Sequence, residues 1–174
     1  MATGLGLSAI FLTVWLSANA AQTTEREPIA TVALAMALIA ASIIDIESYR
    51  LPDLITLPLA IAGVLSGPWL GWSMLLHASA AVVGFLFLYA VSVAYRYLMQ
   101  RDGLGLGDAK LLGGGAAWLG PESIASIVLL ASVLALTLII CSMMMGRRYR
   151  MDDALPFGPF LALSIWIFWN HAPI

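Results

Sequence analysis

Seven apolar stretches, separated by short polar or Gly/Pro-containing segments, leave this chain few possible folds. No polar segment is long enough to build a soluble core, and 61% of the 174 residues are hydrophobic while only 10% are charged. That composition is typical of integral membrane proteins, in which helices satisfy the backbone hydrogen bonds. The sequence therefore predicts an all-α, polytopic protein with one membrane-embedded domain over residues 1–174. The about seven transmembrane or partly re-entrant helices are expected at 4–21, 28–46, 54–70, 72–95, 104–119, 122–145 and 155–170.

Three of these stretches are notably short for a membrane span. A helix needs about 20 apolar residues to cross roughly 30 Å of hydrocarbon, and the stretches after Pro52, Asp102 and Asp153 are shorter than that. We expect these helices to be tilted or partly re-entrant. The first stretch ends in LSANA (16–20), which resembles a signal-peptide cleavage site. Because no Lys or Arg precedes Arg26, we expect this span to be retained.

Basic residues follow alternate spans. Arg50 follows the second span, Arg96 and Arg101 follow the fourth, and further arginines follow the sixth, whereas the turns at 67–71 and 120–122 carry no base. Loops rich in Lys and Arg stay in the cytoplasm. The basic loops and the N-terminus are therefore predicted to be cytoplasmic.

Two aspartates lie on that predicted cytoplasmic side. Asp45 closes the second span, and Asp108 lies near the start of the fifth, in the run GLGLGDAK (103–110). A carboxylate at the centre of a membrane helix costs roughly 2.5–3.5 kcal/mol, so an acid at membrane depth indicates a functional site. Two carboxylates held close together share a proton, so one can activate a water while the other polarises a scissile carbonyl. This arrangement is that of an aspartic protease.

Glycines alternate with apolar residues just before Asp108. Gly103, Gly105 and Gly107 have no Cβ atom, which permits unusual backbone angles and lets an extended substrate approach the acid. We expect this segment to bind substrate through backbone hydrogen bonds. The run is not a phosphate-binding P-loop, because its lysine lacks the G-x-x-x-x-G-K-[ST] spacing.

By themselves these residues leave other functions open. Asp108 could form an ion pair with Lys110 or an arginine, or it could bind a cation together with Asp45. A proton- or cation-coupled transporter is therefore the alternative from a different class, and Gly-interrupted spans fit it too. A third possibility is an inactive assembly subunit of a larger machine.

Few side chains in the chain could bind a metal. Cys141 is the only cysteine, and His77 and His171 are the only histidines. This composition excludes a disulfide within the chain and a cysteine-based zinc site. We expect no metal, no cofactor and no nucleic-acid partner.

Several motifs, in order along the chain, resemble those of the type IV prepilin peptidases, which are GxGD-type membrane aspartic proteases. Asp45 opens D-x-x-x-x-x-L-P-D, which ends at Asp53, and Gly105 to Asp108 match G-x-G-D. The continuation DAKLLGGGAAWLG and the C-terminal LPFGPFLAL (155–163) are also similar to the family. The matched elements cover most of the chain from about residue 40 onward.

The resemblance implies that Asp45 and Asp108 are the catalytic pair. It implies an endopeptidase of the bacterial inner membrane that removes the short basic leader from prepilins or pseudopilins at the cytoplasmic face. The implied partners are the lipid bilayer and the machinery of a type IV pilus or of type II secretion. Many family members carry a cytosolic insertion with paired C-x-x-C motifs, and this chain has Cys141 alone. We therefore expect a short, peptidase-only form without N-methyltransferase activity or S-adenosylmethionine binding.

Three charged residues near the pair are further candidates for substrate contact. Asp53 is expected to cap the following helix, with a role in substrate binding as the alternative. Glu47 is expected to form a polar interfacial surface with Arg50, or to contact the basic leader. Lys110 is expected either to act on Asp108 electrostatically or to bind a lipid phosphate.

Small and aromatic residues give two predictions about packing. The run Gly113 to Gly115 predicts close approach of neighbouring helices, because small residues let membrane helices come together. Trp118, Trp166 and Trp169 predict an external aromatic belt at the membrane interface.

Overall fold

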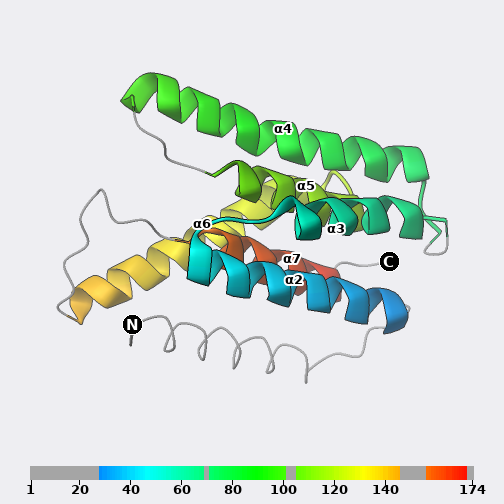
Figure 1. The fold of residues 1–174 in the computed structure, drawn as a ribbon, viewed down its shortest axis with the longest axis horizontal. Helices are drawn as coiled ribbons and strands as arrows, with labels where there is room; N and C mark the ends of the chain where they lie inside the picture. Colours follow the sequence, from blue (N-terminus) through cyan, green and yellow to red (C-terminus); the bar gives the residue numbers. More distant parts are fainter. Residues whose placement is uncertain (1–27, 69–70, 101–104, 146–155, 172–174) are drawn as a thin grey trace.

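The computed structural model describes residues 28–68, 71–100, 105–145 and 156–171 (Figure 1). The described residues form six helices, which confirm the all-α prediction and match the second to the seventh predicted spans. The predicted first span, 4–21, lies outside the described residues. The helices are α2 (Pro28–Ser48), α3 (Asp53–Ser66), α4 (Met74–Met99), α5 (Leu106–Leu119), α6 (Ser123–Met144) and α7 (Gly158–His171).

The six helices fall into two length classes. Helices α2, α4 and α6 have 21, 26 and 22 residues and are long and apolar enough to cross a membrane. Helices α3, α5 and α7 have 14 residues each. At 1.5 Å per residue, such a helix is roughly 21 Å long, which is less than the roughly 30 Å of a bilayer's hydrocarbon core. The prediction of three short helices is therefore confirmed.

Helix α5 is the centre of the bundle. It contacts α3, α4, α6 and α7, and every residue from Asp108 to Trp118 except Lys110 is buried. Figure 1 shows it between α4 on one side and α7 with α2 on the other. A short helix enclosed in this way can place a polar side chain near its end without exposing it to lipid.

Three consecutive glycines explain how neighbouring helices come so close to α5. A Cβ atom on Gly113 would lie 2.8 Å from a backbone oxygen of α4, and one on Gly114 would lie 3.0 Å from a side-chain methyl of α3. A Cβ atom on Gly115 would press against the side chain of Ile165 in α7. The three residues thus face three different helices, which confirms the prediction of close helix packing.

The predicted aromatic belt is wrong in its position. Trp118, Trp166 and Trp169 are at most 2% exposed, so they fill the protein core. The indole N–H of Trp118 donates a hydrogen bond to the carbonyl of Leu59 at 2.8 Å, and that of Trp169 donates to the hydroxyl of Thr31 at 3.2 Å. The reason is that the three rings belong to α5 and α7, which lie inside the bundle and turn few side chains outward.

The glycine contacts predict how α5 responds to added methyl groups. Gly113→Ala should destabilise the protein by about 1–3 kcal/mol, because the backbone oxygen it meets cannot move without shifting α4. Gly115→Ala should cost more, because its Cβ atom would overlap two carbons of Ile165, a fully buried β-branched side chain that is held in one rotamer. Thermal unfolding of both variants in the same detergent measures the difference. Equal melting temperatures for the two variants would contradict this account.

Candidate active site

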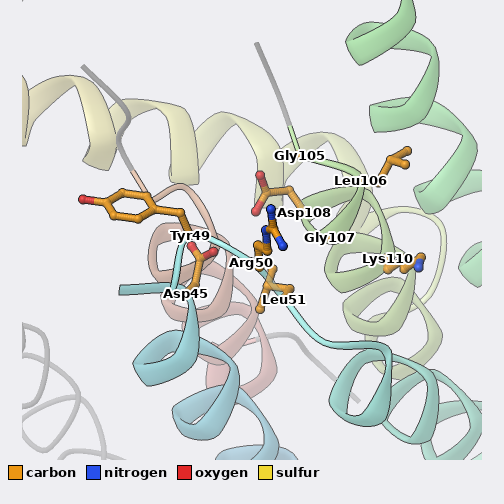
Figure 2. Close-up of a pocket in the computed structure, with 9 residues that line it drawn as sticks. All are labelled: Asp45, Tyr49, Arg50, Leu51, Gly105, Leu106, Gly107, Asp108 and Lys110. Atoms are coloured by element: carbon orange, nitrogen blue, oxygen red, sulfur yellow. The ribbon is translucent and has the colours of Figure 1, made fainter. Parts of the chain in front are cut away.

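A pocket of about 290 Å³ lies where the end of α2 meets the start of α5. Its lining comes from two short segments, and both aspartates singled out in the sequence belong to it. Figure 2 shows both carboxylates directed into the pocket, Asp45 from α2 and Asp108 from α5. The lining residues are Asp45, Tyr49, Arg50, Leu51, Gly105, Leu106, Gly107, Asp108 and Lys110.

Asp45 lies in the last turn of α2 and is only 5% exposed. Its Oδ2 accepts a hydrogen bond of 3.0 Å from the backbone N–H of Gly158, the first residue of α7. The free N–H groups at a helix N-terminus favour a negative charge. A buried carboxylate needs such a partner, and here α7 supplies it.

Gly158 is a site residue that the sequence reasoning did not single out. A Cβ atom at this position would lie 2.7 Å from Oδ2 of Asp45, so a side chain there would displace the carboxylate. Glycine therefore allows the backbone of α7 to approach the acid. The only signal in the sequence was the position of Gly158 within the C-terminal motif LPFGPFLAL.

The backbone turns sharply just after Asp45. Tyr49 adopts a left-handed conformation with φ of 53°, and its N–H donates a hydrogen bond of 2.9 Å to the carbonyl of Asp45. This conformation is rare for residues other than glycine and ends the helix. The turn carries Arg50 and Leu51 into the lining of the pocket. Arg50 therefore belongs to the site, although its position in the sequence suggested only an interfacial surface.

Asp108 lies in the first turn of α5 and is 8% exposed. Its N–H donates a hydrogen bond of 3.2 Å to the carbonyl of Gly105, which occupies the N-cap position of the helix. The positive end of the α5 dipole thus lies beside this carboxylate as well. Each of the two acids is held near the N-terminus of a helix, Asp45 by α7 and Asp108 by its own α5.

The two described glycines of the G-x-G-D motif leave room for neighbouring atoms; they do not adopt unusual backbone angles. Gly105 has φ of −72° and ψ of 144°, which any residue adopts, and Gly107 lies within α5. A Cβ atom on Gly105 would lie 3.6 Å from Oδ2 of Asp108, and one on Gly107 would lie 2.7 Å from Cβ of Leu51. The expectation of unusual angles is therefore wrong for these two residues, and Gly103 lies outside the described residues.

The other three candidates lie at the edge of the pocket or outside it. Lys110 lines the pocket, but its ammonium group forms an ion pair with Asp53, the first residue of α3. Pro52 occupies the N-cap position of α3, so the prediction that Asp53 caps this helix is wrong. Glu47 is exposed and lies outside the pocket lining.

Two acids in one pocket offer a limited set of reactions. A carboxylate can take a proton from a water, and a carboxylic acid can donate a hydrogen bond to a carbonyl oxygen. Among the described residues, no group of three or more His, Cys, Asp or Glu side chains is placed to hold a metal ion. The geometry therefore suits general acid and base chemistry by Asp45 and Asp108.

Comparisons of the sequence with known proteins find a matching family and several similar chains. The profile of the type IV leader peptidase family matches residues 32–140, which include both aspartates. A prepilin leader peptidase/N-methyltransferase of Burkholderia pseudomallei is 39% identical over 135 residues, 77% of this chain and 43% of the relative. Those of Aeromonas hydrophila and Pseudomonas putida are 34% and 36% identical over 140 and 142 residues, 80% and 81% of this chain.

The chain spans about half the length of these curated relatives, since the matched region covers 48% of the Aeromonas protein and 49% of the Pseudomonas protein. No solved structure matches the chain.

Proposed function

The chain belongs to the type IV leader peptidase family, and we propose that it is an aspartic endopeptidase that removes the short basic leader of type IV prepilins or pseudopilins. The observation that carries this proposal is that the carboxylates of Asp45 and Asp108 point into the same pocket. The names of the relatives support the substrate class. We propose peptide hydrolysis for this chain and not the N-methyltransferase activity that the names of the relatives also include.

In the proposed reaction the two acids share the work of hydrolysis. The ionised carboxylate takes a proton from a water as the water oxygen attacks the scissile carbonyl carbon, while the protonated partner gives its proton to the carbonyl oxygen. A tetrahedral diol results. Its collapse breaks the C–N bond: the acid formed in the first step gives its proton to the leaving amine, while the other carboxylate takes a proton from one diol hydroxyl. The pair thereby returns to its starting state. The hydrogen bond from Gly158 holds one oxygen of Asp45 in place during these steps.

The substrate is proposed to enter beside Gly105 in an extended conformation. Gly105 and Leu106 are exposed, and the absent side chain at position 105 leaves space next to the carboxylate of Asp108. Gly105 and Gly107 both line the pocket, so an extended chain would lie against them. Glu47, exposed in the last turn of α2, would attract the basic leader.

The pocket is proposed to face the cytoplasm at the bacterial inner membrane. Arg50 lines the pocket, and Arg96 lies in the last turn of α4. Figure 1 shows the C-terminal ends of α2 and α4 at the same end of the bundle as the start of α5. Arginines mark the cytoplasmic ends of membrane helices. The cleaved product would then be assembled by a pilus or secretion machine.

The paired-acid mechanism predicts that neither carboxylate is dispensable. Asp45→Asn and Asp108→Asn should each lower the rate of leader removal by at least about 1000-fold, because an amide has similar volume but cannot carry the proton. Purified protein in detergent, mixed with a pilin-like precursor that has a short basic leader, provides the assay, read by mass spectrometry. Glu122→Gln, which alters an exposed acid at the start of α6, serves as the control. Cleavage at the wild-type rate by either asparagine variant rules out the mechanism.

The contact with α7 predicts a second loss of activity. Gly158→Ala should lower kcat by about 10- to 100-fold, since its Cβ atom would push the carboxylate of Asp45 out of line. The value of KM should change little, because Gly158 lies outside the pocket lining. Steady-state kinetics on the same precursor measure both constants. Wild-type kcat in a folded Gly158→Ala protein would show that the hydrogen bond to Asp45 has no part in the reaction.

A further inference from the structure

The segment that joins α2 to α3 is held to α5 at two points on either side of Asp108. At the first point Leu51 lies against Gly107, where an added Cβ atom would be 2.7 Å from Cβ of Leu51. At the second point Asp53 forms an ion pair with Lys110. Gly107 comes just before Asp108 in the chain and Lys110 just after it, so the two contacts bracket the acid.

The same segment, residues 49–52, follows the last turn of α2, which carries Asp45. The hydrogen bond from the N–H of Tyr49 to the carbonyl of Asp45 ties the turn to the last turn of α2, and Tyr49, Arg50 and Leu51 then line the pocket. The placement of this segment on α5, together with the hydrogen bond from Gly158 of α7 to Asp45, therefore influences how far the carboxylate of Asp45 lies from that of Asp108. Any shift of the segment along α5 would move one acid relative to the other.

We propose that the ion pair between Asp53 and Lys110 is a clamp that positions the two acids for catalysis. The contact of Leu51 with Gly107 is van der Waals packing, and further along α3 the carbonyl of Leu59 accepts a hydrogen bond from Trp118 of α5. Between these two contacts, the ion pair with Lys110 is a polar attachment of the first residue of α3, beside the acid pair. This inference rests on the proposed function, and it assigns Asp53 and Lys110 a positioning role in place of direct substrate binding.

The exposure of the ion pair between Asp53 and Lys110 distinguishes a positioning role from a contribution to folding stability. The side chains of Lys110 and Asp53 are 31% and 58% exposed. Ion pairs at such exposed positions contribute little to folding stability, because water screens the attraction and two long side chains lose freedom. A loss of this pair should therefore change the reaction far more than it changes the melting temperature.

Charge exchange provides the decisive test. Asp53→Asn and Lys110→Met should each lower kcat for precursor cleavage by about 10- to 100-fold, in line with the cost of a small misplacement of catalytic groups. KM and the melting temperature should stay near their wild-type values. The double variant Asp53→Lys with Lys110→Asp restores an ion pair and should recover part of kcat. The remaining cost comes from a lysine at the N-terminus of α3 and from an added carboxylate in the pocket lining. Glu122→Gln is the matched control for loss of an exposed acid.

Three results would overturn the clamp. A rise in KM without a fall in kcat, not rescued by the charge exchange, would make Asp53 or Lys110 a substrate-binding residue. A fall in the melting temperature with unchanged kcat would make the pair structural only. Wild-type values of kcat in both single variants would remove it from the mechanism altogether.

Hydrogen exchange tests the clamp without any substrate. The N–H groups of Ile55 and Thr56 bond to the carbonyl of Pro52 at 3.1 and 3.3 Å, so they report on the start of α3. Their hydrogen exchange should be faster in each single variant, and the double variant with swapped charges should restore the protection. If the wild type fails to cut any pilin-like precursor, the proposed function is wrong, while this measurement still decides whether the ion pair holds the segment. Unchanged exchange in both single variants would overturn the clamp.

Discussion

The structure depends on backbone donors that reach two buried carboxylates. An acid within an apolar bundle is tolerated only where polar groups replace the water it has lost. Here the N-terminus of α7 supplies a hydrogen bond to Asp45, and Asp108 lies in the first turn of α5. Helix ends must therefore meet at one place, and this requirement determines how α2, α5 and α7 are arranged.

Glycine makes that meeting possible. The backbone of α7 can reach Asp45 only because Gly158 has no side chain, and the turn after α2 can lie on α5 only because of Gly107. Gly113 and Gly114 do the same for α4 and α3 along the rest of α5. The site and the core thus follow from one principle, since close approach of helix backbones both buries α5 and brings its first turn to the end of α2.

The sequence was informative where a physical requirement acts on neighbouring residues and uninformative where it acts between distant ones. Membrane helices must be continuous apolar stretches, so the positions of α2 to α7 could be predicted, and an acid beside such a stretch identified Asp45 and Asp108. The ion pair of Asp53 with Lys110 joins two helices, and neither the period of a helix nor the L-P-D motif encodes it. The burial of Trp169 also depends on which helices surround α7, which its local sequence does not reveal.

The position of the acids along their helices bears on the choice between hydrolysis and transport. A cation pathway would use acids near the middle of the membrane, in helices that are broken there. In this protein α2 runs without interruption from Pro28 to Ser48 and carries Asp45 in its last turn, while Asp108 lies in the first turn of α5. Both acids are therefore at one end of the bundle, where the pocket opens beside exposed Gly105 and Arg50.

A peptide can reach such a site from the water on one side of the membrane, whereas an ion that crosses would need a further polar path along the buried length of α5. That length, from Ala109 to Trp118, contains only apolar residues and glycine apart from Lys110, whose charge is engaged by Asp53. The arrangement thus favours hydrolysis of a substrate that arrives at one face.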